Sequence, residues 1–222
     1  NISGISQEDK RSEIIENGKL VTVAVANITE YVIPEGVTEI GSSVFKGFTT
    51  LRSIVIPKGI TLIGYEAFNG CCALENIVIP DSVTEIGGSA FKGCTALKSV
   101  VIPKGVTKIS YGTFSWCFKL RSVAIPDTVT TIEEYAFSAA LGLESIFYSG
   151  TKEQWNNISI GTINECLTNA TIHFDETSPH MHIVGVPIIE NCTRGMKKQV
   201  GKSQLFTKES LTKIQDKMRN AC

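Results

Sequence analysis

The sequence predicts a repeat solenoid, a fold in which short units of similar sequence stack along one axis. Proline and phenylalanine each recur every 23 residues, and the two series stay in phase. The prolines are Pro34, Pro57, Pro80, Pro103 and Pro126, and the phenylalanines are Phe45, Phe68, Phe91, Phe114 and Phe137. A branched aliphatic residue opens each unit, at Ile28, Leu51, Leu74, Leu97, Leu120 and Leu143. We therefore expect each unit to form one turn of the solenoid, called a rung below, with its places counted from this aliphatic residue.

The first part of each rung is expected to be a β-strand. In the third unit, Leu74, Ile77 and Ile79 occupy the first, fourth and sixth places, and residues two apart in a strand point to the same face. The proline at the seventh place ends the strand. Gly87 and Gly93 then permit the turns that return the chain to the start of the next rung.

The interior of the stack is expected to hold two columns of identical side chains. One rung cannot bury its apolar side alone, so the five in-phase phenylalanines should form an internal column between neighbouring rungs. Cys71, Cys94 and Cys117 share the twenty-first place, where Phe48 and Ala140 also occur. A place that accepts small or apolar side chains is typical of a core position, so these cysteines are expected to be buried free thiols. Stacked side chains of parallel strands point alike, which disfavours a disulfide between them.

The repeated pattern is similar to a known family. Leu-x-x-Ile-x-Ile-Pro, followed by Val-Thr-x-Ile-Gly-x-x-Ala-Phe-x-Gly-Cys, resembles the BspA-type branch of the leucine-rich repeat family over Ile28 to about Phe174. The resemblance implies a leucine-rich-repeat-like solenoid, with a parallel β-sheet on one face and turns and short helical segments on the other. Family members are mostly secreted or cell-surface proteins of bacteria and some protists that bind host or matrix proteins. A shared fold does not identify the partner.

Three parts of the chain are expected: an N-terminal cap (residues 1–27), the repeat array with its closing unit (28–174) and a C-terminal tail (175–222). In the cap, Asn17-Gly18 lies between apolar runs, which is a strong hairpin signal. Val21, Val23 and Val25 continue with the spacing of a strand. The hairpin should cover the first rung.

The closing unit departs from the repeat. The segment YSGTKEQWNNISIG resembles the closing unit of many BspA-type arrays. Trp155 is 23 residues after Ile132 and is expected to continue its column. Leu167, Ala170 and Ile172 repeat the first, fourth and sixth places after 24 residues, which predicts a last strand over Leu167–Phe174.

The C-terminal tail differs in charge from the array. It holds 8 Lys and Arg against 5 Asp and Glu, whereas the preceding residues hold 13 against 17. Thr207 and an apolar face predict a helix over about 208–220. In an oxidising compartment Cys192 and Cys222 could form a disulfide. The helix should dock either on the closing unit of the same chain or on another copy.

The strand face offers a candidate binding surface. The second place is charged, with mostly opposite signs in adjacent rungs, and includes Arg52, Glu75, Lys98 and Arg121. The fifth place points away from the core and is apolar, at Val32, Val55, Val78, Val101, Ala124 and Phe147. Two interpretations stay open for this stripe: β-branched residues favour strands, and exposed apolar patches mark contacts. The charged columns are expected to penalise wrong registers, because exposed ion pairs stabilise little.

Composition and motifs disfavour several functions. The net charge of -1 argues against nucleic acid as the main partner, and no apolar run is long enough to insert in a membrane. The cysteine ladder lacks a fourth metal ligand, and His180 and His182 are expected in a solvated loop. No nucleophile motif or phosphate-binding loop appears. We therefore expect no catalytic, cofactor or metal site.

The surroundings of the protein are indicated only weakly. The chain begins at Asn1 without a signal peptide, which is expected of a mature or trimmed chain. Asn-x-Ser/Thr triplets that could be glycosylated occur at Asn1, Asn27, Asn157, Asn169 and Asn191. The leading hypothesis is a secreted or cell-surface adhesion module that binds a host or matrix protein. The alternative is a structural component that assembles with copies of itself through the C-terminal tail.

Overall fold

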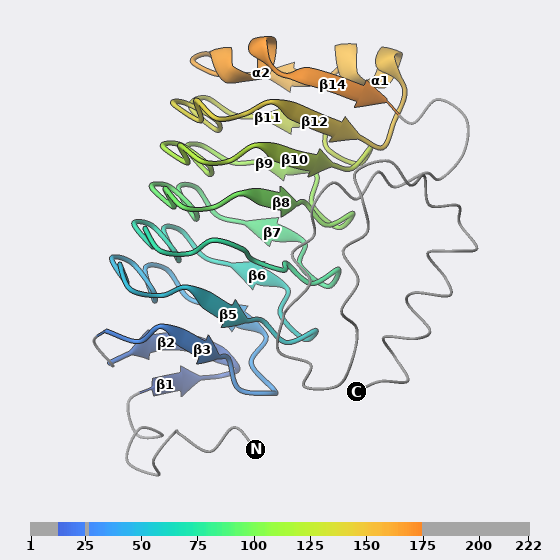
Figure 1. Cartoon of the computed structure of the whole chain (residues 1–222). Helices are drawn as coiled ribbons and strands as arrows, with labels where there is room; N and C mark the ends of the chain where they lie inside the picture. The colour runs from blue at the N-terminus through green and yellow to red at the C-terminus, as the bar shows by residue number, and fades with distance from the viewer. Residues whose placement is uncertain (1–12, 25–26, 175–222) are drawn as a thin grey trace, which may run out of the picture.

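The computed structural model describes residues 13–24 and 27–174. The predicted solenoid is confirmed: the chain makes about seven turns, which stack from the N-terminal hairpin to the closing unit (Figure 1). Each rung passes through a strand, a proline-containing bend, a second short strand and a set of turns. Corresponding places of successive rungs therefore lie side by side.

The first sheet runs along the face that the repeat predicts. Its strands are β3 (Glu30–Val32), β5 (Ser53–Val55), β8 (Ser99–Val101), β10 (Ser122–Ile125), β12 (Ser145–Tyr148) and β14 (Thr171–Phe174). In the third rung Asn76 makes a single bridge to Ser99 in place of a strand. The pairing is parallel and in phase with the repeat, so Ser122 lies between Ser99 and Ser145.

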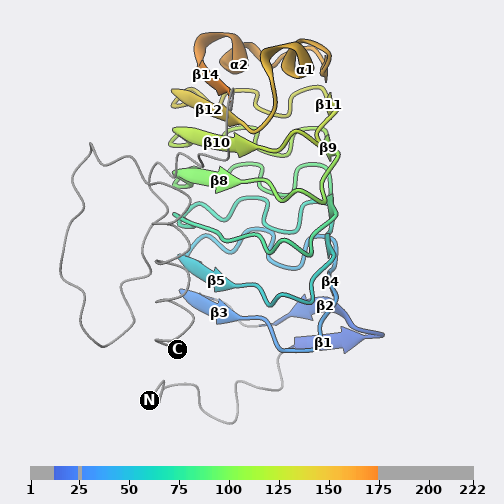
Figure 2. The ribbon, with the colours of Figure 1, turned by 90° about the vertical axis from the view of Figure 1, so that its right-hand side faces the viewer.

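A second parallel ladder lies on the opposite side of the stack (Figure 2). It comprises β4 (Glu39–Ile40), β6 (Leu62–Ile63), β7 (Glu85–Ile86), β9 (Lys108–Ile109), β11 (Thr131–Ile132) and β13 (Ser159–Ile160). The sequence predicts only one sheet, because two residues per rung are too few to display a strand period. Turns follow this ladder in every rung, and within the described residues helices occur only in the closing unit.

The core is a continuous column of aromatic rings. Phe45, Phe68, Phe91, Phe114 and Phe137 are all fully buried. Neighbouring ring centroids lie 5.2 to 5.6 Å apart, and the rings are close to parallel. Tyr31 meets Phe45 edge-on at 5.3 Å and covers the N-terminal end of the column. The repeat spacing of the rungs thus sets the separation of the rings.

The predicted N-terminal hairpin is confirmed. Strand β1 (Glu13–Glu16) pairs antiparallel with β2 (Lys19–Val23), and β2 pairs parallel with β4 of the first rung. The turn residues Asn17 and Gly18 have φ of 50° and 78°, a conformation that Asn-Gly adopts with little strain. The Tyr31 hydroxyl donates a hydrogen bond to the Glu13 carboxylate, which fastens the hairpin to the first rung.

The expected place of Trp155 is wrong. Helix α1 (Lys152–Asn156) contains Trp155, and Ile160 of β13 pairs with Ile132 instead. A helix advances only about 1.5 Å per residue, so α1 takes up additional residues before the chain reaches the second ladder. Trp155 is buried against Tyr148, with ring centroids 5.2 Å apart.

The predicted last strand is correct only in its second half. Leu167 lies in helix α2 (Glu165–Asn169), and β14 begins at Thr171. Ile172 pairs with Ile146, so the expected offset of 24 residues is too short by two. The compact helix replaces the extended start of the rung and shifts the register.

Several predictions fall outside the described residues. These are the C-terminal helix over 208–220, the Cys192–Cys222 disulfide, the sequons at Asn1 and Asn191, Val25, and the loop with His180 and His182.

Candidate binding surface

Four valines form an exposed stripe on the first sheet. Val32, Val55, Val78 and Val101 are 51 to 62% exposed, although their neighbours at the fourth and sixth places are buried. Strand alternation produces this contrast, because successive side chains point to opposite faces. The stripe is therefore flat and runs along the axis of the stack.

The C-terminal part of the stripe is different in character. Ala124 and Phe147 are half-buried, and Phe147 pairs with Ala124 on one side and His173 on the other. The Phe147 and His173 rings stack with centroids 4.8 Å apart and planes 12° from parallel. The valine stripe thus ends in a stacked aromatic pair.

Charged residues at the second place border the stripe. Lys98 Nζ lies 2.5 Å from a Glu75 carboxylate oxygen, and Arg121 is 2.8 Å from Glu144. The hydrogen bond from Lys98 lowers the pKa of Glu75, and the nearby charge of Arg52 acts in the same direction. Within the part of the chain that the structure describes, no ion pair forms at the eighth place. The second-place column therefore carries the pairing of opposite charges.

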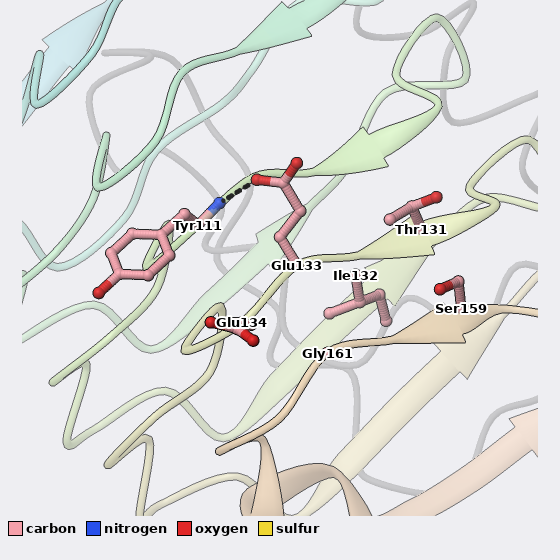
Figure 3. Close-up of a pocket in the computed structure, with 7 residues that line it drawn as sticks. All are labelled: Tyr111, Thr131, Ile132, Glu133, Glu134, Ser159 and Gly161. Atoms are coloured by element: carbon pink, nitrogen blue, oxygen red, sulfur yellow. Dashed lines mark hydrogen bonds between the residues drawn. The ribbon is translucent and has the colours of Figure 1, made fainter.

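A shallow pocket of about 310 Å³ lies on the second ladder near the closing unit (Figure 3). Its lining residues are Tyr111, Thr131, Ile132, Glu133, Glu134, Ser159 and Gly161. The Tyr111 amide donates a hydrogen bond of 2.8 Å to the Glu133 carboxylate, and Lys108 lies 3.0 Å from the same group. The interaction with Lys108 lowers the pKa of Glu133. This pocket thus offers hydroxyl and carboxylate groups to a ligand.

The pocket lacks the arrangement that nucleophilic catalysis requires. Ser159 has no histidine among its lining neighbours, whereas activation of a serine needs an adjacent base. His173 lies on the first sheet, stacked on Phe147. Among the described residues, no group of three His, Cys, Asp or Glu side chains is placed to hold a metal ion. The geometry supports binding more readily than chemistry.

The three cysteines of the twenty-first place lie in the core. Cys71, Cys94 and Cys117 are free and fully buried. Each thiol donates a hydrogen bond to a phenylalanine carbonyl of the preceding rung, at 3.1 to 3.3 Å. Burial raises the pKa of Cys71 and of Cys117 to about 12 and raises the pKa of Cys94 as well. These thiols are structural side chains.

The described sequon asparagines lie on the surface. Asn27, Asn157 and Asn169 are exposed, and Asn157 ends helix α1. All three side chains are thus open to modification in a glycosylating host.

One exposed apolar cluster is not predicted from the repeat. Trp116, Phe118 and Leu141 lie on the turns of two neighbouring rungs and are 49 to 78% exposed. They interrupt a pattern of glycine and threonine in earlier rungs. A search for departures from the repeat would have found them.

None of the helices in the described part of the chain is long and apolar enough to cross a bilayer.

Comparison with protein families gives two matches. Residues 23–144 match six copies of the BspA type leucine rich repeat region. Residues 149–222 match the plasmid recombination enzyme family. The second match overlaps the closing unit and includes the C-terminal tail. No curated protein matches the chain.

Solved structures of bacterial leucine-rich repeat proteins are similar to this chain. A leucine rich cell surface protein from Faecalibacterium prausnitzii is 37% identical over 62% of the chain, with a TM-score of 0.56. A leucine-rich repeat protein of T. pallidum is 26% identical over 67% of the chain, also with a TM-score of 0.56. A protein from Eubacterium ventriosum, 23% identical over 77% of the chain with a TM-score of 0.56, shares the fold.

The matched region is only part of some of these proteins. This chain covers 38% of the F. prausnitzii protein, 77% of the T. pallidum protein and 52% of the E. ventriosum protein.

Proposed function

Because the chain belongs to the BspA-type leucine-rich repeat family, we propose that it is an extracellular or cell-surface protein-binding module that serves in adhesion. The observation that carries this proposal is the exposed valine stripe on a rigid sheet. The printed description of the F. prausnitzii protein as a cell surface protein supports the location. A host or matrix protein is the proposed partner.

The stripe has the physical properties of a contact surface. Val55, Val78 and Val101 present apolar area whose removal from water favours association. Their backbone is fixed by the stack, so little conformational entropy is lost when a partner binds. Charged side chains along the border, such as Lys98 and Arg121, would orient the partner and affect the rate of association.

A triple substitution of valine by threonine separates binding from sheet formation. V55T/V78T/V101T keeps the β-branched shape and therefore the strand preference, but adds three hydroxyl groups to the apolar stripe. We expect binding to immobilised extracellular-matrix proteins to weaken roughly tenfold or more, with the melting temperature nearly unchanged.

The matched control is V21T/I160T, which alters exposed apolar residues on the second ladder. Binding by this variant should equal that of the wild type. Equal binding by V55T/V78T/V101T and the wild type would leave strand propensity as the reason for the valines.

The match of residues 149–222 to the plasmid recombination enzyme family supplies a second candidate function. The C-terminal tail has a surplus of three positive charges, which favours contact with DNA phosphates. Gel mobility of supercoiled plasmid with the full chain and with K197E/K198E tests this candidate. A shift that weakens with salt and is reduced in the variant supports DNA binding, and nicked plasmid would indicate enzymatic activity. No shift at low salt would exclude this candidate.

A further inference from the structure

A convex edge of the solenoid carries a cluster of exposed apolar side chains. Trp116, Phe118 and Leu141 are 53, 49 and 78% exposed. They lie on the turns that follow the second ladder, which project along the left-hand edge in Figure 1. We call these three residues the apolar ridge.

The members of the ridge come from neighbouring turns. Phe118 and Leu141 occupy the twenty-second place of consecutive rungs, so their backbones lie about 4.8 Å apart. The hydrogen bond from the Thr95 hydroxyl to the Cys72 carbonyl shows the same adjacency one rung earlier. Trp116 precedes Phe118 by two residues, with buried Cys117 between them.

Trp116 occupies a backbone position that suits glycine. At this twentieth place Gly47, Gly70 and Gly93 have φ of 76°, 76° and 71°, and Trp116 has φ of 63°. A bulky side chain in the left-handed region is strained. The core does not require the indole, which is half-exposed with the Lys92 ammonium 5.1 Å from its ring centroid. Strain retained for an exposed aromatic side chain indicates a function for that side chain.

The charges around the ridge have one sign. The turns of the three central rungs span residues 89–96, 112–119 and 135–142, and their only charged residues are Lys92 and Lys119. The neighbouring second rung has Glu66, but Lys46 lies 2.5 Å from its carboxylate. An acidic surface would therefore meet two lysines and no carboxylate on these turns.

We propose that the apolar ridge docks on the surface of an anionic lipid bilayer. Tryptophan favours the interface between headgroups and hydrocarbon, and phenylalanine and leucine gain by leaving water. Lys92 and Lys119 attract anionic headgroups. A convex ridge needs a matching groove in a protein partner, whereas a bilayer deforms around it. This contact lies on another side of the stack from the valine stripe, so the module could hold a protein while resting on a membrane.

The test uses residues that the earlier rungs contain at the same places. In the variant W116G/F118T/L141T, glycine relieves the backbone strain and threonine matches Thr95 and Thr49. The full chain is sedimented with vesicles of phosphatidylcholine containing about 30 mol% phosphatidylserine, where each lysine should strengthen binding. The wild type should bind and the variant should need at least about tenfold more lipid.

Two further variants separate the contributions. The control V55T/V78T/V101T removes apolar character from the stripe and should bind vesicles like the wild type. K92Q/K119Q should weaken binding to anionic vesicles but change little with phosphatidylcholine alone. Because Trp155 is buried, a blue shift of tryptophan emission on vesicle binding reports Trp116.

Several results would overturn the proposal. It fails if the wild type does not sediment with anionic vesicles, or if W116G/F118T/L141T binds them equally. It also fails if that variant keeps vesicle binding but loses binding to immobilised matrix proteins, which would make the ridge a protein contact. Loss of matrix binding only in V55T/V78T/V101T would leave the bilayer proposal intact.

Discussion

The phenylalanine at the eighteenth place of each rung stabilises both its own rung and the next. Phe91 lies between the rings of Phe68 and Phe114, at 5.3 and 5.6 Å. We expect F91A to reduce the free energy of unfolding by roughly 3 to 5 kcal/mol, from lost burial and the cavity left behind. Denaturant titration measures this change. The control V78A alters an exposed side chain and should change stability by about 0.5 kcal/mol or less; equal effects of both substitutions would contradict a load on the column.

The reactivity of the cysteines should follow their burial. Cys72 is exposed, whereas Cys71, Cys94 and Cys117 are buried. Thiolate is the reactive form, so in the native protein we expect fast alkylation of Cys72 and almost none of the other three. Peptide mass spectrometry after timed labelling checks this order. A disulfide-linked peptide joining any two of the buried three would disprove the thiol ladder.

The same thiols predict a dependence of stability on pH. Burial raises the pKa of Cys71 and Cys117 to about 12, against about 8.5 for an unfolded cysteine. Their contribution is complete below pH of about 8.5 and is lost as the pH rises toward 12, because only the unfolded chain ionises in that range. Alanine at Cys117 should flatten the decline of melting temperature in this window.

At the scale of secondary structure, helix α1 depends on its first residue. Thr151 accepts a hydrogen bond from the Gln154 amide, and the Gln154 side chain accepts one from the Thr151 amide. We expect T151A to destabilise the closing unit by about 1 kcal/mol. In a W116F background, emission from Trp155 should shift to the red earlier in a denaturant titration than in the parent. A coincident shift would show that the cap is not needed.

The predictability of each element depended on how often it repeats. The rung, the Phe column and the first sheet each recur five times or more in phase, so single residues could be assigned to core or surface. The second ladder has two residues per rung, which is below the length at which alternation can be recognised. In the closing unit, α1 and α2 change the rise per residue, so counting by 23 placed Trp155 and Leu167 wrongly.

The candidate surfaces show the same limit. Val55 and Val78 could be assigned to an exposed stripe because strand alternation fixes the direction of the fifth place. Trp116 and Phe118 could not, because they are breaks in a pattern and periodic reasoning discards such breaks. The Glu133 pocket brings together residues from three rungs and has no linear motif.

At the scale of the whole molecule, each rung contacts only its neighbours, so stability is the sum of local terms along one axis. The hairpin β1–β2 closes one end, and α1 and α2 lie at the other (Figure 1). The valine stripe, the pocket and the apolar ridge lie on different sides of this axis. Binding on one side therefore leaves the others accessible.

The parallel hydrogen bonds between rungs also determine how the molecule would respond to tension. Force applied at the two ends acts along these bonds, and only one inter-rung boundary must open at a time. Each detached rung would release 23 residues, or about 80 Å of extended chain, in exchange for about 4.8 Å of stack height. A protein anchored at one end and bound to a partner at the other would lengthen in steps under load, like a shock absorber, while the remaining rungs stayed folded.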